Sequence, residues 1–534
     1  MKTVAVKTIA KKIVLTFSLC LASLFTSLAA AAEQACESTL DAQEILTTVQ
    51  VSSWGFNIRN TRFQPADLAG LKTPSTQPPA LQWAFDFRNA FQARSQPVVT
   101  QQAIFTGSQS GNLYALDRQS GCVFWKFKAS AEVRTGIVLG TNQAGDVPIL
   151  YFGDFLGTAY AVNAATGNLI WRKTASNFYA ATITGTPVLH DGVLYVPISS
   201  LEVGIAAIPF YPCCRFQGQV TAMNAYTGEW IWNKSVMTEV PKRVGKNSWY
   251  TANYSPSGAP VWSTPTIDVK RNRLYVGTGQ SYMPPAADTT DSIVAMDLDT
   301  GDIVWKQQMT ANDNWNISCI AKGPNCPEPG VDFDFGAPPI LLTLQDGTDR
   351  IFAGQKSGMV YALDPDKDGA QVWQTRVGRG GALGGIHWGI ASDGERIYVP
   401  VSDSDLFTIT PGTPRPGLYA LDPATGDVLW ESKPQYPCGA SVCTPSFSAA
   451  ITVIPGAVLA GDLEGYVTLF DSANGKVLWT FDTDLRWPSV NGRKANGGSI
   501  DSGGPIIAGG QIFVNSGYGL FGKKPGNAFL VLQP

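Results

Sequence analysis

"YAVNAATGNLIW", residues 160–171, has close variants at six other places in the chain. The other copies end at Trp125, Trp232, Trp305, Trp373, Trp430 and Trp479. Every copy has a glycine four residues before its tryptophan. Six copies have Asp or Asn eight residues before the tryptophan, and the Trp373 copy has it nine residues before. Such self-similarity predicts a repeat architecture.

The repeated unit predicts one blade of a propeller. Alternating apolar residues form a strand, Asp or Asn with Thr-Gly forms a tight turn, and the tryptophan begins the returning strand. Upstream segments such as STPTIDVKRNRLYVGTG, residues 263–279, supply two more strands. A unit of about 45 to 75 residues therefore fits a four-stranded antiparallel sheet. Inner strands are expected to begin near Pro97, Arg134, Thr184, Trp262, Phe335, Gly385, Ser446 and Ser499.

The expected fold is all-β, an eight-bladed β-propeller with tryptophan-docking repeats. The C-terminal GNAFLVLQP (526–534) supplies a strand without a tryptophan. The segment LQWAFDF (81–87) contains Trp83 and is expected to complete that blade and close the ring. We expect a signal peptide over 1–32, an N-terminal extension over 33–80, and one propeller domain over 81–534.

The N-terminus has the order of a secretory signal. Four lysines precede a short apolar run, and the small residues SLAAAA follow. Cys20 lacks the small preceding residue of a lipoprotein signal, so we expect a periplasmic or secreted protein without a membrane anchor. Removing residues 1–32 removes four lysines and no acid, so the net charge changes from −3 to −7. This balance does not favour nucleic-acid binding.

Eight cysteines remain after residue 32, and an even number in an exported chain suggests disulfides. Closeness in sequence suggests Cys213–Cys214, Cys319–Cys326 and Cys438–Cys443, which leaves Cys36–Cys122. A bond between the adjacent cysteines of YPCCRFQG (211–218) closes a tight ring. Separate partners for these two cysteines are the alternative. No Cys-x-x-Cys-His occurs in the chain, so no attached c-type haem is expected.

Strand order predicts which residues meet at one face. In each blade, the start of the inner strand and the loop between the second and third strands point to the same end. The unusual residues at these places are Arg134, Glu202, Trp262, Gln280, Asp288, Asp291, Lys356, His387 and Trp388. Carboxylates, an amide oxygen, cations and flat aromatic surfaces suit a planar anionic ligand with a hard cation. Two histidines in the whole chain exclude a histidine-rich metal site.

At these residues the chain resembles the quinoprotein alcohol dehydrogenases, eight-bladed propellers that hold pyrroloquinoline quinone (PQQ) and calcium in the channel. The sequence is most similar to the polyvinyl alcohol dehydrogenase subgroup. Three segments carry this resemblance: ITGTPVLHDGVLYVPISSLEVG (183–204), YPCCRFQG and GQKSGMVYALDPD (354–366). GSIDSGGPIIAGGQIFVNSGYG (498–519) extends the resemblance to the C-terminal end.

The resemblance implies roles for single residues. Glu202 would bind calcium, and Gln280 stands where the family commonly has an asparagine ligand. Arg134 would pair with quinone carboxylates, Trp262 would stack on the ring, and Lys356 would contact quinone oxygens. The remaining implied cofactor contacts are His387, which replaces a frequent asparagine, Trp388, and the pair Cys213 and Cys214.

The resemblance also implies the chemistry. An aspartate in the loop holding Asp288 and Asp291 would remove the alcohol proton while hydride passes to the quinone. Asp291 directly precedes its strand and is favoured as the base and as a further metal ligand, with Asp288 as the alternative. The substrate would be polyvinyl alcohol or another secondary alcohol or polyol. A separate periplasmic cytochrome c would accept the electrons.

Two other functions fit a propeller with this repeat. One is a non-catalytic scaffold similar to the outer-membrane assembly protein, which predicts an empty channel without acidic residues. The other is a binding or sensor propeller that holds the quinone or a sugar without turnover. The acidic residues and the paired cysteines at the predicted face favour the enzyme.

Overall fold

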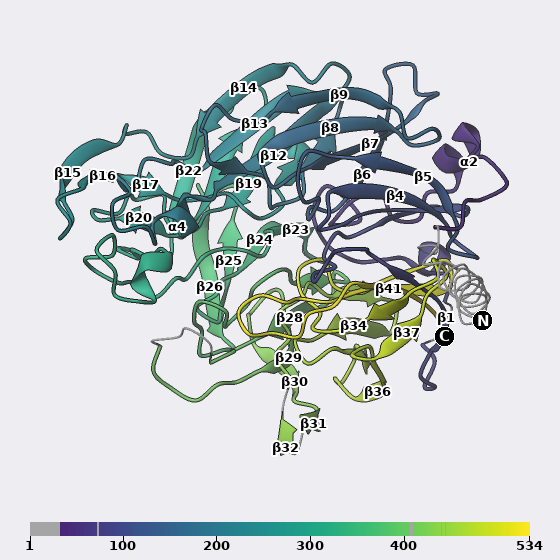
Figure 1. The fold of residues 1–534 in the computed structure, drawn as a ribbon. Helices are drawn as coiled ribbons and strands as arrows, with labels where there is room; N and C mark the ends of the chain where they lie inside the picture. The colour runs from purple at the N-terminus through teal and green to yellow at the C-terminus, as the bar shows by residue number, and fades with distance from the viewer. Residues whose placement is uncertain (1–32, 72–73, 406–409, 439–440, 444) are drawn as a thin grey trace, which may run out of the picture.

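Eight antiparallel sheets form the blades of a propeller in the computed structural model, as the repeat predicts (Figure 1). The structure describes residues 33–71, 74–405, 410–438, 441–443 and 445–534. The predicted signal peptide lies outside these residues. Seven of the described blades have four strands, and one has a fifth, short strand. Most of the apolar core lies between neighbouring blades.

The first four blades run in chain order from residue 98 to residue 308. Their strands are β2 (Val98–Val99), β3 (Ala103–Gly107), β4 (Asn112–Asp117) and β5 (Val123–Lys128); β6 (Val138–Thr141), β7 (Pro148–Gly153), β8 (Thr158–Asn163) and β9 (Leu169–Thr174); β10 (Ala181–Thr182), β11 (Val188–His190), β12 (Val193–Ser200), β13 (Gln219–Asn224) and β14 (Trp230–Ser235); and β18 (Thr266–Asp268), β19 (Arg273–Gly277), β21 (Ser292–Asp297) and β22 (Ile303–Gln308).

The other four blades follow, and the last takes one strand from the N-terminal side of the chain. Their strands are β23 (Ile340–Thr343), β24 (Asp349–Gly354), β25 (Met359–Asp364) and β26 (Ala370–Arg376); β27 (Ala391–Ser392), β28 (Ile397–Val401), β29 (Gly417–Leu421) and β30 (Val428–Ser432); β33 (Thr452–Ile454), β34 (Ala457–Gly461), β35 (Tyr466–Asp471) and β36 (Val477–Asp482); and β39 (Ile506–Ala508), β40 (Gln511–Ser516), β41 (Ala528–Gln533) and β1 (Ala80–Asp86). Strand β1 pairs with β41 and so closes the ring between the two ends of the chain.

Further elements decorate the blades. The two-stranded pairs are β15 (Lys242–Lys246) with β16 (Ala252–Ser255), β17 (Ser257–Gly258) with β20 (Ser281–Met283), β31 (Tyr436–Cys438) with β32 (Ser441–Cys443), and β37 (Arg486–Pro488) with β38 (Lys494–Asn496). The helices are α2 (Ala42–Thr47), α3 (Ala66–Ala69), α4 (Glu202–Ile205) and the 3-10 turns η1 (Val269–Arg271) and η2 (Ile317–Cys319). In Figure 1 the labels β15, β16, β17, β20 and α4 lie together at the left of the molecule. None of the helices in the described residues is long and apolar enough to cross a membrane.

The repeat motif is a turn that docks one blade onto the next. In the second blade the Asn163 side chain accepts hydrogen bonds from Ala165 N and Thr166 N at 2.9 and 3.0 Å. Gly167 has a φ of 72°, which glycine adopts without a steric penalty. A Cβ on Gly167 would lie 2.7 Å from the ring of Trp125 in the preceding blade. Trp125 Nε1 donates to Ala164 O at 3.0 Å. Each motif glycine therefore lets the turn lie flat on the preceding tryptophan.

The N-terminal extension crosses one end of the central channel. This is the end at which the inner strands finish. Backbone groups of residues 51–69 bond with inner strands or their flanks in seven of the eight blades, the exception being the β10–β14 blade. Arg62 is 1% exposed. It donates to the carbonyl oxygens of Ile451, Trp54 and Gly503 and to Gln96 Oε1 at 2.6 to 2.9 Å. This segment therefore closes the channel below the cavity described next.

Three of the expected disulfides are present in the structure. Cys36 bonds to Cys122, Cys213 to Cys214, and Cys319 to Cys326. The Cys36–Cys122 bond fastens the N-terminal extension to the first blade. The pairing predicted for Cys438 and Cys443 concerns side chains outside those that the structure describes.

Candidate functional site

A cavity of about 380 Å³ lies where the inner strands begin. Its walls come from seven of the eight blades, the β33–β36 blade excepted, so residues far apart in sequence meet there. Six of the predicted site residues line it: Arg134, Trp262, Gln280, Lys356, His387 and Trp388. Inner-strand starts and the loops between second and third strands therefore meet at one end, as expected, and bring these six residues together.

Cations and aromatic rings form one side of the cavity. The Arg94 guanidinium lies 4.8 Å from the ring centroid of Tyr518 and 5.6 Å from that of Trp388. The Arg134 guanidinium lies 5.7 Å from Trp388. Burial lowers the pKa of Arg134 to about 10, so it stays charged at neutral pH. Two fixed positive charges on this wall would attract an anionic ligand.

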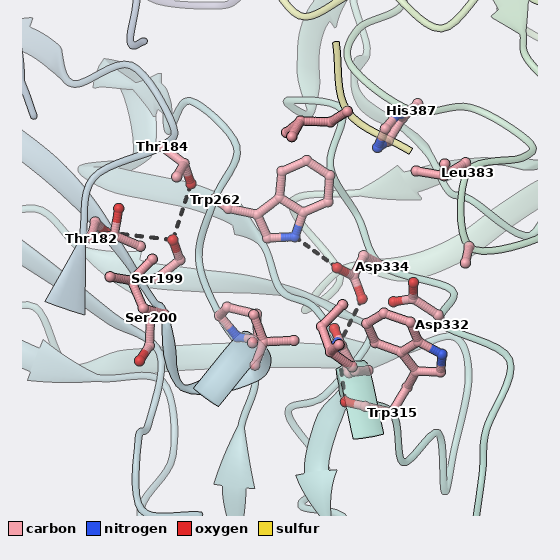
Figure 2. Close-up of a pocket in the computed structure, with 18 of the residues that line it drawn as sticks. Thr182, Thr184, Ser199, Ser200, Trp262, Trp315, Asp332, Asp334, Leu383 and His387 are labelled. Carbon is pink, nitrogen blue, oxygen red and sulfur yellow. Dashed lines mark hydrogen bonds between the residues drawn. The ribbon is translucent and has the colours of Figure 1, made fainter. Parts of the chain in front are cut away.

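A carboxylate pair and a lysine also line the cavity, and Figure 2 shows the two carboxylates, Asp332 and Asp334, near Trp262. Lys356 Nζ lies 3.1 Å from Asp332 Oδ1 and 3.5 Å from Asp334 Oδ2. Asp334 accepts hydrogen bonds from Trp262 Nε1 at 2.8 Å and from Gln280 N at 3.0 Å. Burial alone would lower the pKa of Lys356, but the two carboxylates outweigh burial and raise it. Lys356 is therefore a cation held among acids.

The Trp262 ring is fixed from several directions. It meets Trp388 edge-on, with ring centroids 5.1 Å apart and an angle of 82° between the planes. Lys356 Nζ lies 5.5 Å from the Trp262 ring centroid. A Cβ on Gly336 would lie 2.1 Å from Trp262, so that close approach requires glycine. The ring therefore offers the cavity a preset flat surface.

Hydroxyl groups from the β10–β14 blade form a third wall. Thr182, Thr184, Ser199 and Ser200 all line the cavity. Figure 2 shows their side chains on one side of Trp262. Thr184 Oγ1 and Ser199 Oγ share a hydrogen bond of 3.0 Å. These hydroxyls can donate to or accept from a polar ligand.

Several buried polar atoms of the wall have no hydrogen-bond partner within the described residues: Arg94 Nε, Arg134 Nε, Thr182 Oγ1, Gln280 Oε1 and Trp388 Nε1. Buried polar atoms of folded proteins are nearly always satisfied. Orphaned donors and acceptors that surround one cavity indicate that a polar ligand completes them.

His387 is neutral and anchored away from the cavity centre. Its Nδ1 lies 2.8 Å from Ser448 Oγ, and Ser448 Oγ donates to Asp501 Oδ1 at 2.7 Å. Burial lowers the pKa of His387 to about 3. Asp501 also lies 3.7 Å from Arg94. His387 therefore belongs to a network that positions the cationic wall.

Glu202 lies behind the cavity wall rather than on it. Its carboxylate accepts hydrogen bonds from Tyr211 OH at 2.6 Å, Arg215 N at 2.9 Å and Phe216 N at 2.7 Å. Burial raises the pKa of Glu202, and these donors oppose that rise. Its neighbours Val203 and Gly204 line the cavity. In the structure, Glu202 fastens helix α4 to the loop after the paired cysteines.

The Cys213–Cys214 bridge is also one layer behind the wall. Both residues are fully buried in a core cluster with Phe216 and Tyr282. Tyr282 lines the cavity, and its ring centroid is 6.3 Å from that of Phe216. The bridge thus lies near the cavity without lining it, and its contact with a cofactor stays a prediction.

Asp288 and Asp291 lie outside the cavity lining. Asp288 is largely exposed and pairs with Lys306 at 2.6 Å. Asp291 is fully buried, and neither of its oxygens has a hydrogen-bond partner in the described part of the chain. Burial, and then the nearby Asp313 and Asp334, raise the pKa of Asp291 well above its usual value. Asp291 is therefore a buried acid outside the lining that contains Asp332 and Asp334.

Sequence reasoning did not select Asp332, Asp334, Arg94 or Tyr518. The segment VDFDFG (331–336) directly precedes the inner strand of its blade, so the inner-strand rule covered both aspartates. Arg94 has the same position just ahead of the first blade. Tyr518 follows β40 in the loop between the second and third strands of the last blade, a place that the rule also covers.

The comparisons with known proteins point to one group. A family model described as outer membrane protein assembly factor BamB matches residues 77–318 and 356–522. A polyvinylalcohol dehydrogenase of Pseudomonas sp is 37% identical over 92% of this chain and 76% of its own length. A polyvinylalcohol dehydrogenase of Sphingopyxis sp. (strain 113P3) is 39% identical over 88% of this chain and 72% of its own length. The crystal structure of quinohemoprotein alcohol dehydrogenase from Comamonas testosteroni has the same fold, with a TM-score of 0.63 and 17% identity over 95% of this chain and 83% of that one.

Proposed function

The chain belongs to the polyvinylalcohol dehydrogenase family, and we propose that it oxidises the hydroxyl-bearing carbons of polyvinyl alcohol, or of other secondary alcohols and polyols, to carbonyls with PQQ as cofactor. The observation that carries this proposal is the cavity, because its charges and orphaned polar atoms lie where a planar anionic quinone would need them.

The donor set fits PQQ. Arg94 and Arg134 would pair with the quinone carboxylates, and the hydroxyls of Thr184, Ser199 and Ser200 would bond its edge. Trp262 would lie against the ring face. Lys356 would contact the quinone oxygens. When bound, the quinone supplies the two-electron acceptor for hydride from the alcohol carbon.

Oxygen ligands for a hard cation are present on the same wall. The orphaned Gln280 Oε1 lies in the cavity lining with the Asp332 and Asp334 carboxylates, and this set suits calcium. Glu202, a predicted ligand, already accepts three donors. We therefore propose Gln280 and Asp332 as the main cation ligands, with Asp334 beside the cation rather than bound to it. Asp291, the other predicted ligand, has free oxygens but lies behind this wall.

Asp334 is the proposed base, in place of Asp291 or Asp288. Hydrogen bonds from Trp262 Nε1 and Gln280 N orient its carboxylate in the cavity lining, where a general base must lie. Asp332 is less suited, because burial raises its pKa well above the usual value. Asp334 would take the hydroxyl proton of the alcohol, and Lys356 would balance the charge of the carboxylates.

The electrons then leave the protein. We propose a periplasmic or secreted enzyme that passes them to a separate cytochrome c. With a bound two-electron cofactor, repeated turnover would require an external electron acceptor.

A titration of the purified protein with PQQ tests the cofactor assignment. Quenching of protein fluorescence should be saturable in the presence of calcium, and Arg94→Ala with Arg134→Ala should weaken binding at least tenfold, because two charge-assisted pairs are lost. Arg172→Ala, at a surface arginine of β9, is the matched control. Equal binding by all three proteins would contradict the proposed orientation. No saturable binding to the unaltered protein would contradict the cofactor.

A further inference from the structure

Four large aromatic side chains are exposed on two segments next to the cavity lining in sequence and on the β15–β16 hairpin that is bonded to one of them. Tyr179, Phe210, Trp249 and Tyr250 are 72%, 71%, 61% and 83% exposed. Together these four residues are called the aromatic platform below. Soluble proteins seldom expose several large apolar groups together unless the surface binds something.

The platform is continuous with the cavity wall. Tyr179 is three residues before Thr182, and Phe210 is six residues after Gly204; both Thr182 and Gly204 line the cavity. Tyr179 OH and Tyr211 OH share a hydrogen bond, and Tyr211 OH also donates to Glu202. The rim segments that build the cavity thus continue outward into the platform.

Buried asparagines hold the platform rigidly. Asn247 Nδ2 donates to Pro209 O at 2.8 Å and to Asn325 Oδ1 at 2.7 Å, and so ties the β15–β16 hairpin to the α4 loop. Asn247 Oδ1 accepts from Trp249 N at 2.9 Å and shapes the tip that carries Trp249 and Tyr250.

A second asparagine extends this network to the other side of the mouth. Asn325 is fully buried, and its Nδ2 donates to Ala206 O and Ile208 O at 3.1 and 3.0 Å. Helix α4 also contacts η2, which carries the cavity residue Ile317. A preset surface loses little conformational entropy when it binds a ligand.

We propose that the aromatic platform binds the polymer chain of the substrate on either side of the hydroxyl-bearing carbon that enters the cavity. This proposal rests on the proposed function. Polyvinyl alcohol alternates methylene carbons with hydroxyl-bearing carbons and carries no charge. Its methylene edge would lie on the ring faces, while its hydroxyls would stay in water or bond the tyrosine hydroxyls.

The mouth itself agrees with an uncharged, amphiphilic chain. The cavity lining also includes the apolar side chains of Leu201, Val203, Ile317, Leu383, Leu520 and Phe521. A charged redox partner is the other possible occupant, because Lys242, Arg243 and Lys246 lie exposed on the same hairpin. Such a partner would be held by charge and would respond to salt, whereas the polymer would not.

Two measurements test the proposal on the full chain. In native gels cast with polyvinyl alcohol, the cofactor-free protein should migrate more slowly than in plain gels, and Phe210→Ala/Trp249→Ala should reduce this retardation. In assays of the PQQ-loaded enzyme, the same variant should raise the KM for polyvinyl alcohol on the order of tenfold relative to the KM for 2,4-pentanediol, a diol that spans two hydroxyl units.

Matched variants separate the possible causes. Trp249→Phe keeps a ring and should retain most of the retardation. Val269→Ala removes a side chain that is 59% exposed in η1, away from the mouth, and should change neither measurement. Lys242→Ala/Arg243→Ala should leave the polymer KM unchanged at low and high salt.

The outcomes decide whether the surface binds the polymer or a redox partner. Unchanged retardation and KM ratio in Phe210→Ala/Trp249→Ala would overturn the platform. A salt-dependent loss of acceptor reduction in the same variant, with an unchanged KM for polyvinyl alcohol, would also overturn it. That result would indicate a docking surface for the redox partner. If the unaltered protein is retarded by polymer but oxidises neither alcohol, the platform stands and the proposed function fails.

Discussion

Asp334 is the residue on which the chemistry is expected to depend. Asp334→Asn keeps the shape of the side chain but removes the basic oxygen, so kcat should fall by about 10²- to 10⁴-fold while PQQ still binds. Steady-state dye reduction and a PQQ titration measure the two effects separately. Asp291→Asn should retain most activity, because Asp291 lies outside the cavity lining. The reverse order of the two variants would restore Asp291 as the base.

A second carboxyl, Asp462, makes stability depend on pH. Burial raises its pKa from 3.8 to about 8. Its Oδ1 accepts from Glu464 N and Tyr466 N, but its Oδ2 has no partner in the described residues. At the matching turn of the second blade, Tyr160 OH bonds Asp154 Oδ2 at 2.7 Å. The residue six positions after Asp462 is instead a threonine, which cannot provide a phenol.

The folded state therefore keeps a proton on Asp462 that the unfolded chain releases above pH 4. Stability should fall as the pH rises from about 4 to about 8, by up to about 1.4 kcal/mol per pH unit from this group. Asp462→Asn should flatten that part of the profile in denaturant titrations at several pH values. Asp154→Asn, the matched control, should lower stability by loss of its Tyr160 bond without flattening the profile. An unchanged slope in Asp462→Asn would contradict the assignment.

At the scale of the element, the docking turn is the unit that repeats. Gly228 has a φ of 73°, and a Cβ there would lie 2.7 Å from Trp171. Gly145 has a φ of 80° but nothing within 4 Å. Gly145→Ala should therefore cost about 1 kcal/mol of backbone strain. Gly228→Ala should cost at least about 2 kcal/mol more, because the turn must move off the ring. Equal losses in the free energy of unfolding would show that the Gly–Trp contact is not a docking contact.

Sequence reasoning predicted the blades well because their signals are local. The Asn163–Gly167 turn and the Trp171 that follows it in the same copy lie within nine residues, and each copy repeats the same pattern. The exception is Trp479. The blade that follows it lacks the docking turn, and Trp479 Nε1 has no hydrogen-bond partner in the described residues. The β15–β16 hairpin carries no repeat signal, so the sequence did not predict it.

The site was predicted only in part for the same reason. Inner-strand starts placed Arg134 and Trp262 at one face, and the loop between the second and third strands placed Lys356 there. Asp332 and Asp334 also directly precede an inner strand. The family resemblance instead pointed to the loop of Asp288 and Asp291 for the base, and a resemblance cannot align single residues across a loop of different length. The position of Glu202 behind the wall depends on side-chain contacts with Tyr211 and with the 215–216 backbone, which no spacing reveals.

At the scale of the whole molecule, the N-terminal extension holds the ring and closes its far end. Arg62→Met would leave the carbonyl oxygens of Ile451 and Gly503 without a donor in the described residues, since Trp54 O still accepts from Gln96 Nε2, and should lower the free energy of unfolding by roughly 2–5 kcal/mol. Arg59→Met changes an exposed side chain with one bond of 3.3 Å to Thr343 and should cost under about 0.5 kcal/mol. Guanidinium titrations of the two variants measure the difference. Equal free energies of unfolding in the two variants would mean that the Arg62 hydrogen bonds do not stabilise the ring.

Turnover by the purified protein is the most direct test of the central claim, that this propeller is a PQQ-dependent alcohol dehydrogenase. The protein is loaded with PQQ and calcium, polyvinyl alcohol is added, and reduction of an artificial electron-acceptor dye is followed. The account predicts dye reduction that requires both the polymer or a secondary alcohol and PQQ, and that is lost in Asp334→Asn. Saturable PQQ binding without oxidation of polyvinyl alcohol or any secondary alcohol would contradict it.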